Sequence, residues 1–248
     1  VSLIFIFLLS LTSLAGDNIL FKGVSFSAAN KTTTSDDIKP IAAINANWIS
    51  IVPYGFLKDH EIVYDSKFQW VGERPEAIRE CVKLAKEQGL KVMIKPHIWI
   101  GHSTYTGIYT CETEAQWEKF EASYKKYIMT FVDLAVSEKV EMFSIGTEWG
   151  KFVEARPQFW KDLIKEIRTK YTGKLIYAAN WDDYQKVPFW NQLDYIGIDS
   201  YFPLSIAENP KISELIKSWK TIMPLIEQYS SSKKKKVVFT EFGFKSTS

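Results

Sequence analysis

The sequence predicts an α/β protein, a (β/α)8 TIM barrel from which the eighth strand is missing. Three observations support this fold. Strand-like and helix-like segments alternate along the 248 residues until seven strands have been passed. The strand-like segments are continuous apolar runs, as expected for parallel strands that are buried on both faces. No Gly-x-Gly-x-x-Gly follows the first of them, so the signature of a dinucleotide-binding fold is absent.

We expect residues 17–248 to form one domain, because barrels of this length are routinely single domains. The predicted strands are residues 20–26, 48–52, 90–97, 140–143, 174–180, 193–199 and 236–244. Helices are predicted at 35–45, 75–88, 113–134, 157–170 and 213–229. The sequence ends soon after the seventh strand, so we expect the barrel to be truncated at its C-terminus.

Local signals support two of the helix starts and one functional loop. Pro75 suits the first turn of a helix, and Thr113 with Gln116 forms a capping box. The connection of about fifteen residues after strand 90–97 is long for a compact domain, which predicts a functional loop. A polar loop is expected from Pro53 to Arg74, and the connection after strand 174–180 is too short for a full helix.

The first sixteen residues differ from the rest of the chain. Residues 3–14 are almost wholly apolar, and Ser13-Leu14-Ala15 resembles the small-x-small site at which secretory leaders are cleaved. The run is shorter than the ~20 residues needed to span a bilayer. The chain begins at Val1 without a basic segment, so we expect an incomplete leader. These features predict a secreted protein, extracellular or periplasmic, with no membrane association after cleavage.

The amino-acid composition limits the classes of molecule that this protein is expected to bind. The formal charge of +2 provides no field that would favour nucleic acid or a membrane surface. Nine Trp, twelve Tyr and sixteen Phe are more aromatic residues than a core of this size usually needs. Trp and Tyr have flat faces suited to stacking on sugar rings, although most are expected to pack in the core. Cys81 and Cys111 are expected to be free thiols. We expect a monomer.

Two glutamates occupy matching positions at the ends of predicted strands. Glu148 follows Ser144-Ile145-Gly146-Thr147, and Glu241 follows Lys236-Val237-Val238-Phe239-Thr240, about ninety residues later. The carboxyl ends of barrel strands meet at one rim, so both side chains are expected there. A retaining glycosidase needs such a pair, one carboxylic acid to protonate the leaving oxygen and one carboxylate to attack the sugar.

With these strand-end acids, the chain resembles the clan A glycoside hydrolases, and within that clan glycoside hydrolase family 113. The resemblance covers the chain from about Leu20 to its end. It is specific for the clan and moderately specific for the family. The matching stretches are 22–25, 144–148, 190–203 and 240–243. The resemblance implies β-mannanase activity, a carbohydrate substrate and no cofactor or metal.

The resemblance also implies roles for the two acids. In the clan, the glutamate after strand four is the general acid/base and the one on strand seven is the nucleophile, which here are Glu148 and Glu241. Most of the clan has Asn directly before the acid/base, where this chain has Thr147. Thr reaches less far toward a sugar hydroxyl, so Asn180 at the end of the fifth strand is the alternative donor.

Further polar and aromatic residues at strand ends are candidates for substrate binding. They are His97, Trp99, Trp149, Asn180, Trp181, Asp199 and Tyr201. Tyr201 can donate a hydrogen bond to Glu241 and keep it ionised. For Trp149, packing in the core is at least as good an interpretation. Asp199 can bind a sugar hydroxyl or hold a loop.

Two other functions fit the sequence. A non-catalytic carbohydrate-binding barrel is the alternative, because the missing strand commonly carries an aromatic platform in the clan. A metal-dependent hydrolase using His97, Asp199 and Glu241 is the third. The three histidines, His60, His97 and His102, lack the spacing of a metal triad. The preferred sugar and the choice between internal and terminal cleavage stay open.

Overall fold

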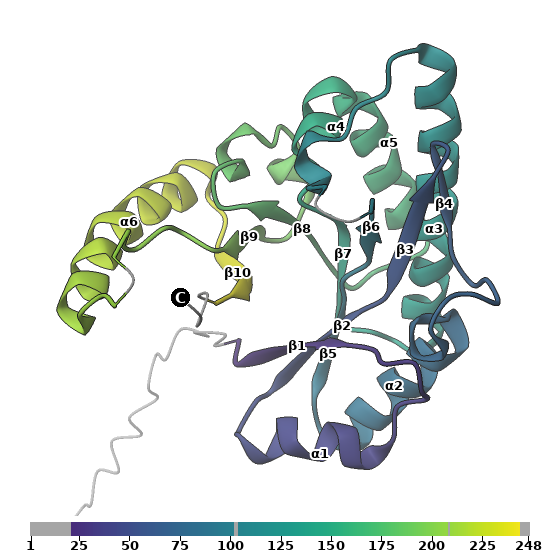
Figure 1. The fold of residues 1–248 in the computed structure, drawn as a ribbon, viewed down its shortest axis with the longest axis horizontal. Coiled ribbons are helices and arrows are strands. Elements are labelled where there is room, and N and C mark those ends of the chain that lie inside the picture. The colour runs from purple at the N-terminus through teal and green to yellow at the C-terminus, as the bar shows by residue number, and fades with distance from the viewer. Residues whose placement is uncertain (1–20, 102–103, 208, 244–248) are drawn as a thin grey trace, which may run out of the picture.

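The structure, a computed structural model, describes residues 21–101, 104–207 and 209–243 (Figure 1). The predicted leader, residues 1–16, lies outside this range. Seven parallel strands form one curved sheet, and their order in the sheet is their order in the chain. They are β1 (Gly23–Ser27), β2 (Trp48–Val52), β5 (Lys91–Ile94), β7 (Met142–Thr147), β8 (Lys174–Asn180), β9 (Ile196–Ser200) and β10 (Val237–Phe242). The predicted fold class is confirmed as a nearly closed parallel barrel, with β1 and β10 at the two ends of the sheet.

Helices follow most of the strands and lie outside the sheet (Figure 1). They are α1 (Ser35–Ala43), α2 (Pro75–Glu87), α3 (Glu114–Ser137), α4 (Gly150–Ala155), α5 (Pro157–Arg168) and α6 (Ile212–Lys233). Five of the six were predicted, and the short α4 was not. The capping box is confirmed, because the Gln116 amide donates to Thr113 Oγ1 over 3.3 Å and the Thr113 amide donates to Gln116 Oε1 over 3.1 Å. Two short 3-10 helices, Tyr184–Lys186 and Trp190–Gln192, replace the helix between β8 and β9.

The stretch expected to be a polar loop after β2 contains regular structure, so that prediction is wrong. It forms β3 (Tyr54–Lys58), β4 (Glu61–Val63) and the 3-10 helix η1 (Val71–Glu73). β3 pairs antiparallel with β4 and parallel with β6 (His97–Trp99), which makes a second, three-stranded sheet.

The predicted strand 90–97 also differs, because it breaks after Ile94 and its last residue begins β6 instead. The small sheet rests on α3. The Ile62 amide donates to Ser123 Oγ over 2.7 Å, and the Tyr127 hydroxyl donates to the carbonyls of Pro53 and His97.

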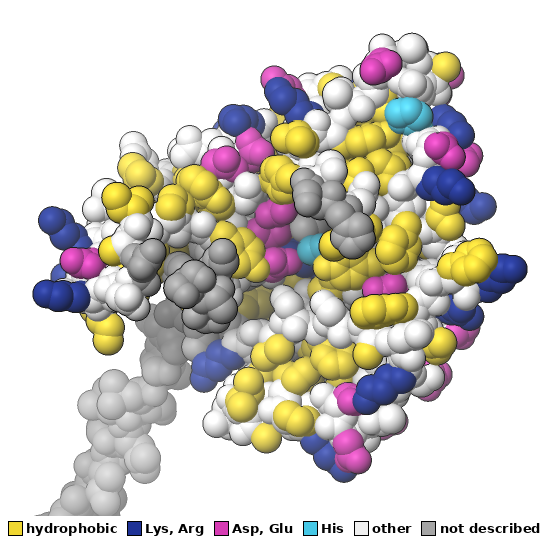
Figure 2. All heavy atoms as spheres, in the orientation of Figure 1, with side chains coloured by type: hydrophobic (Ala, Val, Ile, Leu, Met, Phe, Trp, Pro, Cys, Tyr) yellow, Lys and Arg dark blue, Asp and Glu magenta, His cyan; other side chains and the backbone are white. Residues whose placement is uncertain are grey.

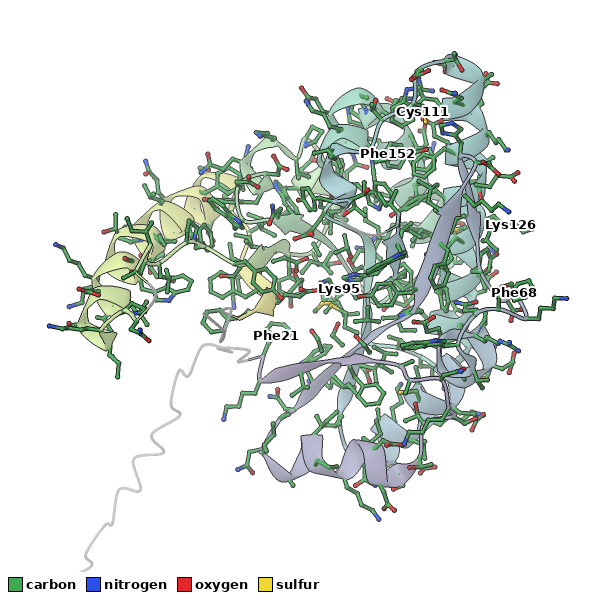
Figure 3. All side chains as sticks on the ribbon, viewed as in Figure 1. Phe21, Phe68, Lys95, Cys111, Lys126 and Phe152 are labelled. Carbon is green, nitrogen blue, oxygen red and sulfur yellow. The ribbon has the colours of Figure 1, made fainter. Side chains whose placement is uncertain are left out.

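The core lies on both faces of the barrel sheet. Every residue of β2, β7 and β9 is buried, which agrees with the continuous apolar runs of the sequence. A cluster of aromatic side chains fills the space between β7 and the helices that cover it, around Phe152 (Figure 3). Cys81 and Cys111 are free thiols, as predicted, and both are buried. In the part of the chain that the structure describes, no helix is long and apolar enough to cross a membrane.

Candidate active site

The polar strand ends gather at one rim of the barrel. Glu148 directly follows β7, and Glu241 lies near the end of β10. The register of the sheet places Asn180 beside Asp199, and Asp199 beside Glu241. Figure 2 shows acidic side chains and a histidine in a hollow near the middle of the face it displays. The prediction that the strands are parallel and deliver both glutamates to one end is therefore confirmed.

Glu148 sits at a sharp turn between β7 and α4. Its φ of 55° lies in the left-handed region, which costs a non-glycine residue about 1–3 kcal/mol. Two hydrogen bonds hold the turn: the Glu148 amide donates to the Ala178 carbonyl over 2.7 Å, and the Trp149 amide donates to the Tyr177 hydroxyl over 2.7 Å. Burial raises the pKa of Glu148 to about 8, and the negative charge of Asp199 adds to the shift. The carboxyl is therefore mostly protonated at neutral pH.

Glu241 has the opposite electrostatic environment. Burial alone would raise its pKa, but the ammonium of Lys95, together with smaller contributions from His97 and the Tyr201 hydroxyl, outweighs burial and holds the pKa below its ordinary value. Lys95 Nζ donates a hydrogen bond to Glu241 Oε1, and the Tyr201 hydroxyl donates to Oε2 over 2.7 Å. His97 Nε2 lies 3.5 Å from Oε1. The carboxylate is therefore ionised, and both of its oxygens are held.

Lys95 is the residue that sequence reasoning missed. Its side chain is fully buried and contacts both oxygens of Asp199, at 3.0 and 3.2 Å, as well as Glu241. Thr240 Oγ1 donates to Asp199 Oδ1 over 2.7 Å. The available signal was a lysine placed at the end of an apolar run, just before Pro96. Asp199, 1% exposed, is therefore an internal ion-pair partner, and the expectation that it binds a sugar hydroxyl is wrong.

The same ion pairs bear on the metal hypothesis. The Lys95 ammonium lies between Asp199 and Glu241, so these carboxylates form an ion-pair network rather than a metal-ligand set. Among the described residues, no group of three His, Cys, Asp or Glu side chains is arranged to hold a metal ion. His97 is kept neutral, because burial and the charge of Lys95 lower its pKa to about 3.

Two hollows open at this rim, one beside each glutamate. The hollow beside Glu241 has a volume of 780 Å³ and extends along β1 and β10, the two ends of the sheet; its lining also includes Tyr54, His97 and Tyr201. The hollow beside Glu148 has a volume of 210 Å³, and its lining includes Asn180. Aromatic and polar side chains therefore surround Glu241, while the other hollow is largely formed by α4 and the segment after β8.

The tryptophans do not all lie where the sequence suggested. Trp149 is 1% exposed, with its ring centroid 5.4 Å from Phe120 and 5.7 Å from Tyr124. It is a core residue, so the expectation that it stacks on a sugar is wrong. Trp99 is exposed on β6, and the half-buried Trp181 packs 5.7 Å from the Phe202 ring. Neither is among the described residues that line the two hollows.

The surroundings of Glu148 include residues from the predicted functional loop. Gly107 lines the same hollow, and the charge of Glu148 contributes to a raised pKa of Tyr105, whose main cause is burial. Asn180 Nδ2 donates to Asp182 Oδ1 over 2.9 Å. Thr147 is buried and donates to the Pro96 carbonyl over 3.4 Å, so it faces the barrel interior. Asn180, which lines the hollow beside Glu148, stays the candidate donor to a sugar hydroxyl.

Solved structures with this fold include enzymes that act on glycosides. A β-mannanase of family 113 from Alicyclobacillus acidocaldarius superposes with a TM-score of 0.77 at 23% identity, over 88% of this chain and 69% of that one. A second family 113 β-1,4-mannanase gives 0.73 at 20% identity, over 88% and 71%. A β-glucuronidase from Ruminococcus gnavus gives 0.58 at 13% identity, over 83% and 31%. At these identities the similarity establishes the fold alone.

Family membership comes from the sequence itself. No curated protein shows a significant match to the chain. The sequence profile of Glycoside Hydrolase Family 113 matches residues 24–248, which covers nearly all of the described residues. The chain therefore belongs to Glycoside Hydrolase Family 113, a β-mannanase family of glycoside hydrolases.

Proposed function

We propose that this protein is a retaining β-glycoside hydrolase that acts on a mannan-like β-linked polysaccharide, with Glu148 as general acid/base and Glu241 as nucleophile. One observation carries the proposal: two glutamates at one rim have surroundings that drive their pKa values apart. In acid/base enzymes, such a difference assigns the proton donor to the group with the raised pKa and the anion to the other.

The chemistry follows in two balanced steps. In the first, a Glu241 oxygen bonds to the anomeric carbon while the glycosidic C–O bond breaks, and the departing oxygen takes the proton of Glu148. In the second, Glu148 takes a proton from water as that water attacks the anomeric carbon. The bond from the anomeric carbon to Glu241 breaks as the bond to water forms, and a product with the original β configuration leaves. This mechanism requires the two carboxyl groups to stand about 5–5.5 Å apart.

The hollows suggest how the substrate lies across the site. The reacting sugar must contact the nucleophile, so it occupies the hollow beside Glu241, where Tyr54, His97 and Tyr201 can contact its hydroxyls. The leaving group must contact the acid, so it lies toward Glu148 and Asn180. Trp99 and Trp181 are kept as candidates for stacking on more distant sugars. The names of the two similar mannanases make β-1,4-mannan the first substrate to test.

The direct test compares hydrolysis of β-1,4-mannan by the parent enzyme and by Glu148→Gln and Glu241→Gln. Each variant should lose at least about 1,000-fold in kcat, because each removes an essential acid/base or nucleophilic group. Glu227→Gln, an exposed position on α6, is the matched control and should behave as the parent.

Proton NMR determines the anomeric configuration of the first product formed. The β-anomer should appear first. If the α-anomer appears first, the enzyme inverts configuration and the nucleophile assignment is wrong. If the parent binds mannan without cleaving it, the alternative of a carbohydrate-binding barrel replaces this proposal.

A further inference from the structure

Lys95 has an unusual place for a lysine. It follows β5, which lies third in the sheet, and its contacts are on β9 and β10 at the far end of the sheet order. The side chain therefore crosses the barrel interior, and in Figure 3 it lies near the middle of the molecule. It is 0% exposed. Burying an ammonium ion is costly unless opposite charges and hydrogen bonds compensate for lost water.

Asp199 and Thr240 fix where the ammonium sits. Asp199 faces Lys95 with both oxygens, at 3.0 and 3.2 Å, and Thr240 donates to the same carboxylate over 2.7 Å. Asp199 also stands next to Glu241 in the register of β9 and β10. An ammonium anchored in this way has a donor left for Glu241 Oε1, while the Tyr201 hydroxyl serves Oε2.

We propose that Lys95, anchored by Asp199, is the positioning residue that keeps Glu241 ionised and oriented, and so makes the two glutamates chemically different. This inference rests on the function proposed above. Lys95 acts through Glu241 rather than on the sugar. Without a fixed cation in the barrel interior, a partly buried carboxylate beside Asp199 would favour its protonated form.

Several other groups face Glu241, and each has a defined contribution. His97, from β6, is neutral at neutral pH because burial and Lys95 lower its pKa to about 3, and in its charged form it adds to the lowering of the Glu241 pKa. Tyr201 is a neutral donor, and burial raises its pKa. Asp199 carries a negative charge, and Glu148 gains one when it ionises. Both charges oppose the ionisation of Glu241. Among these facing groups, Lys95 is the cation.

The test separates positioning from a purely structural ion pair. Lys95→Met alone would strand Asp199 as a buried charge without a partner, which risks misfolding. The informative pair is therefore Asp199→Asn and the double variant Lys95→Met/Asp199→Asn, which differ only in the ammonium. Lys95→Arg keeps the charge, and Lys217→Met on the exposed side of α6 is the surface control.

The first readout is the pH dependence of kcat/KM for aryl β-mannoside hydrolysis. Relative to Asp199→Asn, the double variant should lose at least about 100-fold in kcat/KM. Its acidic limb should move up by about one pH unit or more, because the nucleophile no longer has a cation beside it. Lys95→Arg keeps a positive charge, so the acidic limb of its pH profile should lie closer to that of the parent than the limb of the double variant does. Lys217→Met should match the parent. If the folded double variant keeps the acidic limb of Asp199→Asn, the proposal is overturned.

A second readout does not depend on turnover. Carbon-13 NMR of the glutamate carboxyls, with the Glu241 signal assigned by its loss in Glu241→Gln, reports the titration of Glu241 directly. That signal should titrate at higher pH in the double variant than in Asp199→Asn, and equal titration in both would refute the role of Lys95. An inactive parent that still shows this shift would contradict the proposed function while supporting the inference.

Discussion

At the residue scale, Glu148 and Glu241 have the same side chain and differ only in their surroundings. Glu148 lies in a buried turn among negative charges, whereas Glu241 contacts the ammonium of Lys95. Their strand-end positions could be predicted, because a polar residue that ends an apolar run stands out. Lys95 could not, because its partners lie 104 and 146 residues away in the chain.

The misassigned residues also have a local explanation. The left-handed backbone at Glu148 turns the chain sharply, so the next side chain, Trp149, packs among core aromatics instead of facing the rim. No sequence pattern marked a glutamate with positive φ. The position of Asp199 at a strand end predicts a role in binding a sugar hydroxyl or holding a loop, but a buried lysine from the other side of the barrel occupies its oxygens.

The first prediction at this scale concerns pH. Glu241 must be ionised, and its pKa is lowered, so kcat/KM should fall on acidification only below the ordinary range of a glutamate, near 4.5. Glu148 must be protonated, and its pKa is raised to about 8, so activity should fall as pH rises through about 8. A pH profile of kcat/KM measures both the acidic and the basic fall in activity. The control is the stability of the folded enzyme at each pH. A basic limb near pH 5 would contradict the assignment of Glu148.

At the element scale, strand-to-strand contact is close enough to require particular glycines. Gly197 in β9 faces β8, where an added Cβ would stand 2.2 Å from the Tyr177 carbonyl oxygen. Backbone in the middle of a sheet cannot move aside cheaply. By contrast, a Cβ at Gly23 in β1 would stand at an ordinary contact distance of 3.5 Å from Trp48 Cβ.

Gly197→Ala should therefore lower the free energy of unfolding by about 1–3 kcal/mol, as overpacking does elsewhere. Gly23→Ala is the matched control and should change it by less than about 0.5 kcal/mol, as surface substitutions usually do. Urea unfolding followed by circular dichroism measures both. Equal stability of the two variants would show that β8 and β9 are not packed as described.

The seven barrel strands and five main helices were predictable at this scale because each contains its own periodicity or capping signal. The small sheet was not. β4 and β6 have three residues each, and β6 pairs with β3 across about forty residues of chain. Segments this short lack a readable pattern, and Pro53 after strand 48–52 predicts a loop, whereas in the structure it joins β2 to β3.

At the scale of the whole molecule, the parallel barrel brings side chains from β5, β7 and β10 to one rim although they are far apart in the chain. The fold class was predictable because strand-like and helix-like segments alternate and the strand-like segments are continuous apolar runs. Secretion, suggested by residues 1–16, stays a prediction, as does the monomeric state. The formal net charge of the chain is only +2, so the protein has little long-range field with which to attract a charged substrate.

A neutral polysaccharide and a nearly neutral enzyme should meet without electrostatic steering. We therefore expect kcat/KM on β-1,4-mannan to change by less than about 2-fold between low and high salt, because screening has little to act on. Steady-state kinetics over a series of sodium chloride concentrations test this. A steep fall of kcat/KM with salt would show that electrostatic attraction contributes to the encounter with mannan, and would contradict this expectation.

The central claim is the division of labour between Glu148 and Glu241, and azide rescue tests it most directly. With a mannoside carrying an excellent leaving group, Glu148→Ala should still form the covalent intermediate, which then awaits a nucleophile. Added azide should speed turnover and give the β-mannosyl azide, since a small anion needs no general base.

For Glu241→Ala, azide should displace the leaving group directly and give the α-mannosyl azide. Proton NMR of the two products reads the configuration. The β-azide from Glu148→Ala and the α-azide from Glu241→Ala are the predicted result. An α-azide from Glu148→Ala would contradict the account, because Glu148 would then be the nucleophile.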